Sequence, residues 1–250
     1  MQTESRETDI SRDFFVYLRV SLRAVYEKIA VNYLIFILGL YFLAAGIVLI
    51  LRSSLGTTPI SSVNYVLSLH TPLTLGAWTF LVNLLLIAGQ FWFVRDRMTR
   101  RRTVEILLQL PFSFLFGFFI DLNMALTGGL QPQSYFMAIV FLLCGCLIQS
   151  VGVVLEIKPR VAMMSAEGFV NFGSQRYGKD FGRFKVAFDV SLVTIAAVLS
   201  LVLARQVEGV REGTVIAALV TGYIVNFLNR RVITWAMLRR VLPRRAEAAR

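Results

Sequence analysis

Residues 46–52 read GIVLILR, and 106 positions further along the chain residues 152–158 read GVVLEIK. The same shift pairs Gly76 with Gly182. Matches among aliphatic letters are common by chance, because apolar runs of any origin resemble one another. Glycines and a terminal cation that match in order carry more weight. The pattern therefore predicts that one structural unit occurs twice in the chain.

The last part of each unit follows the same pattern with a shift of 105, so one residue was gained or lost between the copies. This shift pairs Gly117 with Gly222 and Asp121 with Asn226. The glycines are kept while an ionisable residue in the first copy stands opposite an amide in the second. The sequence thus indicates a symmetric scaffold with asymmetric polar groups.

The composition is that of a membrane protein. Hydrophobic residues make up 56% of the 250 residues and charged residues 16%, whereas soluble chains carry about 45–50% and about 25%. Six apolar runs approach the roughly 20 residues that a helix needs to cross about 30 Å of hydrocarbon. We expect an all-α polytopic fold with six transmembrane helices at about 31–52, 76–94, 103–126, 134–156, 184–204 and 210–236.

Two further segments are helical in character but too short to cross the bilayer. They cover residues 55–69 (LGTTPISSVNYVLSL) and 161–175 (VAMMSAEGFVNFGSQ), and they are related by the shift of 106. Short pieces that carry Gly, Pro, Ser and Thr suit broken or re-entrant half-helices. Each unit is therefore predicted to hold three spans and one half-helix, in the ranges 31–126 and 134–236.

Lysine and arginine in short loops set the orientation, because cytoplasmic loops are enriched in them. Five arginines lie at 95–102, the loop 127–133 (TGGLQPQ) is uncharged, and the tail 237–250 is basic. Residues 1–30 hold a basic amphipathic stretch that suits a helix lying in the cytoplasmic interface. Both termini are then cytoplasmic. Because a three-span unit ends on the side opposite to its start, the second copy is predicted to be inverted.

Other classes of function find little support. The net charge of +11 is placed beside apolar runs, so it indicates topology and membrane lipid rather than nucleic acid. No Cys or His cluster accompanies the single His70, and we expect neither a metal nor a cofactor. Enzyme motifs are absent, including a phosphate-binding glycine loop. The chain is therefore not expected to be an enzyme.

Polar residues in the half-helices are the first candidates for a substrate site. The first half-helix offers hydroxyl and amide groups, and the second offers Glu167 with Asn171 nearby. Hydroxyls at a helix start suit an anionic group, or they simply cap the helix. A carboxylate suits a cation. The first set is Thr57, Thr58, Ser61, Ser62 and Asn64.

Asp121 and Asn226 complete the predicted substrate site, because polar residues inside a membrane span are costly and often functional. As repeat partners they are expected to face each other across a pseudo-two-fold axis. Asp121 and Glu167 are also the candidates for proton coupling. The alternative for Asp121 and Asn226 is a structural hydrogen bond between the third and sixth spans.

These motifs resemble a known family. LGTTP (55–59), LGAW (75–78) and GFFID (117–121) in the first half, with the stretches 165–182 and 208–222 in the second, are similar to the YczE/YyaS/YitT family of bacterial integral membrane proteins. The C-terminal soluble domain of YitT-type members has no counterpart here. The resemblance implies a location in the bacterial cytoplasmic (inner) membrane. It supplies neither a substrate nor catalytic residues.

Inverted repeats with broken helices near the bilayer midplane are typical of secondary transporters. We therefore expect a transporter of a small polar or charged solute, working by alternating access as a monomer or homodimer. The alternative is a non-transporting membrane accessory protein that binds a partner enzyme or complex. A third alternative, a passive channel, has no selectivity ring to recommend it.

Overall fold

The computed structural model describes residues 29–232, and this part of the chain is helical with no strand. Six helices are long and apolar enough to cross a membrane, which confirms the predicted polytopic all-α fold. The predicted interfacial helix covers residues 1–30, of which only the last two are described. The basic tail, residues 237–250, lies wholly outside the described residues. The six spans are Ile29–Arg52, Leu75–Arg97, Arg100–Leu126, Tyr135–Ile157, Phe181–Ala204 and Glu212–Val232.

Both short segments form separate helices. Helix α2 covers Pro59–His70 and starts with proline in the first turn, where the missing N–H is not needed. Helix α7 covers Ser165–Tyr177 and ends at Gly178 in the left-handed conformation, which glycine adopts without strain. With 12 and 13 residues at 1.5 Å per residue, each is well short of about 30 Å.

The third span is broken where one helix was expected. Helix α4 covers Arg100–Leu107 and α5 covers Gln109–Leu126, with a turn at Leu108 between them. Pro111 explains the break, because it has no N–H to donate to the carbonyl of Leu107 and its ring clashes with that turn. Helix α3 (Leu75–Val94) joins this span through a short 3₁₀ turn, Arg95–Arg97.

Helix boundaries recur at the spacing that the sequence repeat predicts. Helices α2 and α7 begin at 59 and 165, and α3 and α8 (Phe181–Ala204) begin at 75 and 181. Even the caps match. Thr74 accepts a hydrogen bond from the backbone of Ala77, and Asp180 accepts one from Arg183. The order of long and short helices is therefore the same in both halves.

The first span and α6 (Tyr135–Ile157) pack backbone to backbone at glycines. Gly39 lies against Glu156, and seven residues further on Gly46 lies against Gln149, so the two helices run antiparallel. A Cβ at either glycine would overlap the backbone of α6. Small residues permit this approach between membrane helices.

The same interface is symmetric under the repeat. Gly145 of α6 lies against Ile50, and Gly152 lies against Leu43. A shift of 106 relates these two contacts to those that Gly39 and Gly46 make with α6. A two-fold axis between two copies exchanges their contacts in this way. Inversion of one copy also requires the two helices to run antiparallel. That the two units face opposite sides of a bilayer stays a prediction.

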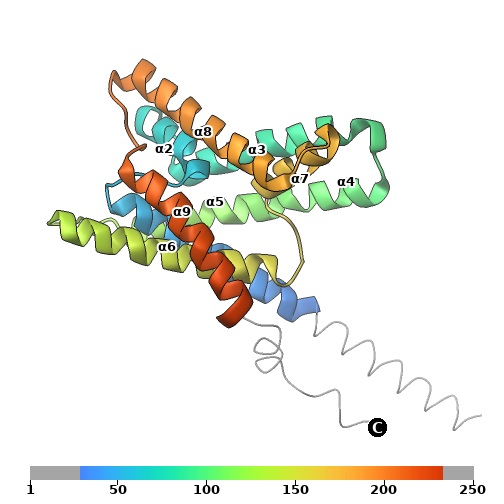
Figure 1. Cartoon of the computed structure of the whole chain (residues 1–250), viewed down its shortest axis with the longest axis horizontal. Coiled ribbons are helices and arrows are strands. Elements are labelled where there is room, and N and C mark those ends of the chain that lie inside the picture. Colours follow the sequence, from blue (N-terminus) through green and yellow to red (C-terminus); the bar gives the residue numbers. More distant parts are fainter. Residues whose placement is uncertain (1–28, 233–250) are drawn as a thin grey trace, which may run out of the picture.

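Each short helix packs on the opposite half of the chain. Helix α2 packs against α8, whereas α7 packs against α3 (Figure 1). Val66 of α2 is fully buried with Leu192 and Ala196 of α8, and Val170 of α7 belongs to the same core. Helix α9 (Glu212–Phe227) lies along α6. The two halves are therefore interlocked.

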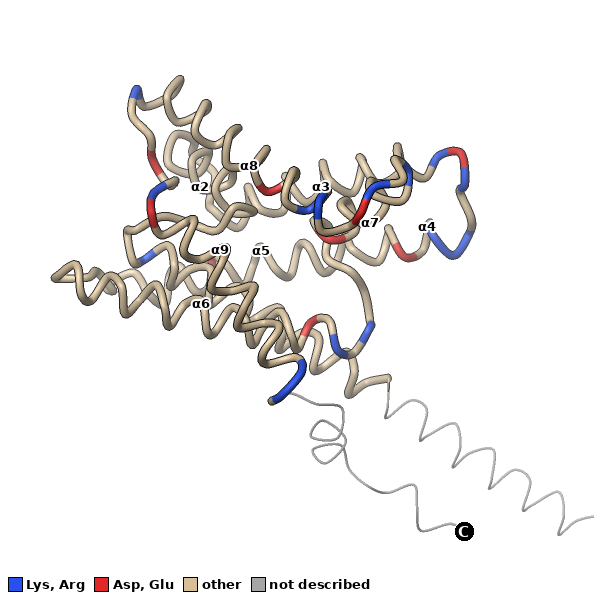
Figure 2. Tube along the Cα trace, viewed as in Figure 1, with Lys and Arg blue, Asp and Glu red and all other residues tan. Residues whose placement is uncertain are grey.

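The outside of the helix bundle is apolar, as a lipid-facing surface must be. Charged residues gather at the ends of the helices and in loops, and the middle portions are almost free of them (Figure 2). Helices α6, α8 and α9 expose large apolar side chains along their length. Examples are Phe136, Leu143, Val190, Val198, Val202, Leu219 and Phe227.

Substituting Gly46 by leucine is expected to destabilise the protein, because its side chain would enter the backbone of α6 at Gln149. Overpacking of this kind costs about 1–3 kcal/mol. Thermal unfolding of the purified protein in detergent measures the loss. The control is Gly129→Leu, where no atom lies within 4 Å of an added Cβ. Equal stability of both variants would contradict the packing described.

Candidate functional site

The start of α7 is held by a buried polar ladder. Gln90 of α3 and Gln109 of α5 exchange two hydrogen bonds through their side-chain amides, at 2.8 and 2.9 Å. Gln90 also donates to the carbonyl of Ser165 at 3.0 Å, and the hydroxyls of Ser113 and Ser165 lie 2.8 Å apart. Both glutamines are at most 2% exposed. The ladder fixes the second half-helix to the third span.

The start of α2 is held at the equivalent place by the sixth span. The backbone N–H of Thr57 donates to the Thr214 hydroxyl at 3.2 Å, and the Thr57 hydroxyl donates to the carbonyl of Gly209 at 3.0 Å. A shift of 105 maps Gln109 onto Thr214. The two half-helices are thus anchored by matching positions that carry different side chains.

The loop before α2 closes against the start of α9 along its whole length. The N–H of Gly213 donates to the carbonyl of Leu55 at 2.8 Å, and Arg211 donates to the carbonyl of Ser54 at 3.1 Å. Gly56 has φ +136 and lies against Thr214, where a side chain would clash. We call these contacts between residues 54–57 and 209–214 the α2 seal.

A side-chain hydrogen bond beside the α2 seal joins the end of α2 to the loop before α9. His70, the last residue of α2, lies 2.8 Å from Glu208 in the loop between α8 and α9. Hydrogen bonds from Gln206 and then from His70 lower the pKa of Glu208. The carboxylate is therefore charged at neutral pH, and it loses this charge only as the pH falls through its lowered pKa.

The hydroxyl-bearing residues predicted at the start of α2 are buried, and most of their hydrogen bonds are made to one another or to the nearby backbone. The hydroxyls of Thr58 and Ser61 lie 2.7 Å apart, and Ser62 donates to the carbonyl of Pro59. Thr58 occupies the cap position, yet its side chain makes no capping bond to the helix. Simple capping therefore does not account for Thr58.

Asn64 differs from its neighbours because half of its amide has no partner. Its Nδ2 donates to Thr79 of α3 at 3.2 Å, while its buried Oδ1 accepts no hydrogen bond among the described residues. The buried Nδ2 of Asn83, one turn beyond Thr79, also has no partner there. Buried polar atoms without partners are rare and often mark functional places.

Asp121 binds the start of α3 and does not meet Asn226. Its two oxygens accept hydrogen bonds from the Thr74 hydroxyl at 2.6 Å and from the backbone N–H of Gly76 at 2.7 Å. Asn226 is exposed on α9. The expected pairing across a pseudo-two-fold axis is therefore not seen, because Asp121 already has partners on α3.

Glu167 and Asn171 line a cavity of about 790 Å³. The cavity lies between the α4–α5 region, the end of α6 and α7, on the side that carries the basic loops. Glu156, which is 4% exposed, also lines it, together with Arg160. The remaining lining includes Thr99, Arg101, Arg102, Glu105, Gln109, Val161, Ala162, Met163, Gln175 and Phe181.

The cavity combines both signs of charge. Arg101 and Glu105 form an ion pair at 2.9 Å near its rim. Glu156, Glu167 and Arg160 have no salt-bridge partner among the described residues. Two carboxylates and a guanidinium facing one water-accessible space can bind an ion, a zwitterion or a proton.

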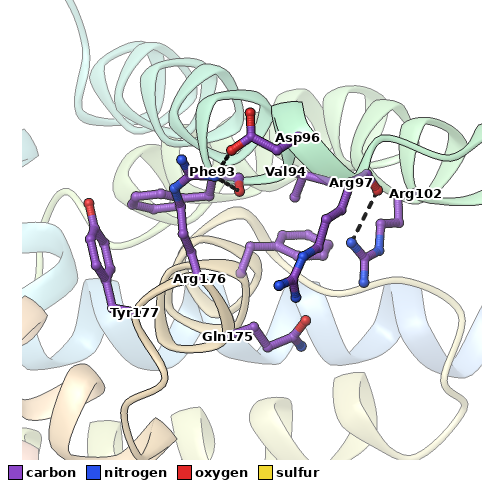
Figure 3. A pocket seen from close by; sticks show the side chains of 9 residues that line it. Phe93, Val94, Asp96, Arg97, Arg102, Gln175, Arg176 and Tyr177 are labelled. Atoms are coloured by element: carbon purple, nitrogen blue, oxygen red, sulfur yellow. Dashed lines mark hydrogen bonds and ion pairs between the residues drawn. The ribbon is translucent and has the colours of Figure 1, made fainter.

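A second cavity of about 350 Å³ adjoins the first and shares Arg102, Phe172 and Gln175 with it. Arg176 on α7 binds Asp96 at 2.7 Å and the carbonyl of Phe93 at 3.2 Å (Figure 3). This contact joins α7 to the end of α3. The cavity is lined further by Val94, Arg97 and Tyr177.

The structure thus divides the predicted site residues. Glu167 and Asn171 share the large cavity, and Asp121 and Asn226 lie at two other places. Thr57 belongs to the α2 seal, Thr58, Ser61 and Ser62 lie at the start of α2, and Asn64 contacts Thr79 of α3. The sequence-based prediction did not include Glu156, Gln90 and Gln109. A glutamine within an apolar run was the available signal, since amides inside membrane spans are rare and seek partners.

Fold and cavities together define a polytopic α-helical membrane protein with a charged cavity at one end. A family model matches residues 30–230, so the chain belongs to DUF6198, a family of unknown function. No curated protein and no solved structure matches the chain. The resemblance to the YczE/YyaS/YitT family stays a prediction.

Replacing Gln90 or Gln109 by leucine is expected to lower stability by about 1–3 kcal/mol each, because the other amide is left buried and unpaired. The double variant removes both amides and should lose less than the two single losses combined. The expected coupling is about 0.6–1.7 kcal/mol. Unfolding in detergent measures this cycle, with Gln133→Leu in an exposed loop as control. Strict additivity would contradict the ladder.

Proposed function

We propose that the protein is a secondary transporter of a small polar or charged solute in the bacterial cytoplasmic membrane. It works by alternating access between its two halves. The conformation described here corresponds to the state open toward the side of the basic loops, which the charge rule assigns to the cytoplasm. The proposal is supported by one observation above all, a difference between two places that the repeat makes equivalent.

That difference concerns the loops that precede α2 and α7. Residues 55–57 contact residues 209–214 directly in the α2 seal. A shift of 106 maps residues 55–57 onto residues 161–163, which line the large cavity instead of closing it. If the two halves exchange these arrangements, the closed end opens and the open end closes. This exchange is alternating access.

The spans that flank the two half-helices show the same difference, with one pair closed and the other open. Helices α3 and α5 touch where Gly76 meets Gly117. A Cβ added at Gly222 of α9 would meet no atom within 4 Å, and one added at Gly182 would meet only Asp180 of its own cap. Helices α8 and α9 diverge from their shared loop in Figure 1. One glycine pair is therefore closed and its counterpart is open.

The charged groups that line the large cavity favour a charged or zwitterionic solute as the substrate. Burying a carboxylate is costly, so Glu156 and Glu167 at a cavity near the membrane are retained for a reason beyond stability. Arg160 offers a cation beside them. We assign proton coupling to Glu167, with Glu156 beside it, rather than to Asp121, whose oxygens bind α3.

A leucine at Gly222 is expected to hold the protein in the state described here. Among the described residues no atom lies within 4 Å of a Cβ added at Gly222, so the leucine begins in open space, but it would prevent α9 from closing on α8. The probes are cysteines at Val161, in the cavity, and at Leu55, in the α2 seal, in a Cys144→Ala/Cys146→Ala background. An impermeant maleimide should label Val161→Cys from the side of the basic loops. Labelling of Leu55→Cys from the other side should be lost.

The matched control is Gly117→Leu, which clashes with Gly76 in the closed pair. It is expected to favour the opposite state and to raise the labelling of Leu55→Cys. If Leu55→Cys stays inaccessible in the parent and in Gly117→Leu, the α2 seal does not open and alternating access is wrong. The protein would then fit the accessory role better.

Glu167→Gln is expected to abolish solute uptake while the protein stays folded, because the amide cannot exchange a proton. A thermal-shift screen against metabolites and ions first identifies the solute, since a ligand stabilises the folded state by mass action. Uptake into proteoliposomes then compares the variants. Glu105→Gln is the control, because Glu105 lines the same cavity but is paired with Arg101 at the rim. Full uptake by Glu167→Gln would remove this carboxylate from the mechanism.

A further inference from the structure

The smaller cavity, of about 350 Å³, is unusual for its surplus of positive charge. Three guanidinium groups line it, from Arg97, Arg102 and Arg176, against one carboxylate, that of Asp96. Asp96 is already bound to Arg176 at 2.7 Å and lies 3.4 Å from Arg95. The carboxylate is therefore not available to the other two arginines.

Arg97 and Arg102 carry no carboxylate partner among the described residues. Within that part of the chain, their guanidinium groups make a single hydrogen bond, from Arg102 to the carbonyl of Arg97 at 3.2 Å. Figure 3 shows Arg97 reaching into the space toward Gln175 on α7, with Arg102 beside it. Two guanidiniums with unused donor groups thus face one cavity. The Gln175 amide beside them donates one hydrogen bond to Asn171, at 3.1 Å, and keeps its second N–H.

We propose that this cavity binds a phosphate group. Guanidinium presents a planar fork of donors that matches phosphate oxygens, and two such forks can balance the charge of one phosphate. The Gln175 amide supplies a further donor. Apolar Phe93, Val94 and Phe172 line the other side of the space.

The position admits two sources of phosphate. The cavity adjoins the basic loop 95–102 at the membrane surface, where the headgroup of an anionic phospholipid lies. It also adjoins the large cavity, through which a soluble phosphate could arrive. The shared chemistry is an anionic phosphate oxygen cluster held between α4 and α7. Binding of this kind does not depend on transport.

If these arginines served only to set the membrane topology, the variants would behave differently. In that case only the total charge of the loop matters, and any arginine of the loop is as good as another. Arg100 provides the comparison, because it is exposed at the start of α4, close to the other two arginines in the sequence, and lines neither cavity. Arg100→Gln makes the same change of charge as Arg97→Gln or Arg102→Gln.

The test measures binding to the purified full chain in a neutral detergent. Inorganic phosphate is titrated by thermal shift, and short-chain phosphatidylglycerol by native mass spectrometry, with phosphatidylcholine as the neutral comparison lipid. Arg97→Gln and Arg102→Gln are each expected to weaken binding about tenfold, as the loss of a charge-assisted hydrogen bond implies. Arg100→Gln should bind as the parent does.

Binding of inorganic phosphate alone identifies a soluble ligand, and binding of phosphatidylglycerol alone identifies a lipid headgroup. Either result supports the site if the variants follow the expected order. The proposal is overturned if neither probe binds saturably. It is also overturned if Arg100→Gln weakens binding as much as Arg97→Gln, because the charge of the loop then acts diffusely. Unfolding without ligand confirms that each variant is folded.

Discussion

The close contact between the first span and α6 is the constraint on which the arrangement of the protein depends. Four glycines, Gly39, Gly46, Gly145 and Gly152, let the two backbones approach without side chains between them. Lipid offers helices no hydrophobic incentive to associate, so such packing has to come from shape. The contact is symmetric under the shift of 106, because the contacts of Gly39 and Gly46 map onto those of Gly145 and Gly152.

The order of long and short helices recurs in the two halves, whereas the polar groups at equivalent positions differ. Thr214 and Gln109 occupy equivalent positions and anchor different half-helices. Ser61 is enclosed with Thr58, whereas its counterpart Glu167 faces a cavity. Symmetry lets two states have nearly equal energy, and the unlike side chains allow the states to differ in what they bind.

Much of the fold could be predicted because the relevant signals are local. Apolar runs, the two short segments and the spacing of 106 follow from hydropathy and glycine positions alone. Lys185 and Asp189, four residues apart on α8, form an ion pair at 2.5 Å, which is a contact that helical spacing alone brings about. The break near Pro111 was missed, although proline inside a helix is a local signal too.

The site was predicted less well, because its members meet only through tertiary contacts. Pairing Asp121 with Asn226 assumed that both halves have the same conformation. The structure has α3 and α5 closed while Gly222 of α9 is open, so the two residues have different surroundings. Glu156 did not enter the predicted site, because nothing along the chain places it beside Glu167. No single segment of the sequence could reveal that cavity.

The crossed packing of the half-helices also has a consequence for how the chain is made. Helix α2 leaves the ribosome long before α8, yet α8 is the surface against which it packs. Contacts between segments so far apart in the sequence slow folding, because the intervening chain must be ordered first. Synthesis adds roughly 5–20 residues per second, so α2 waits for seconds beside the translocon or in the lipid interface. During that time the start of α2 also lacks the hydrogen bonds that Thr57 makes with Gly209 and Thr214, because that part of the chain is synthesised later still.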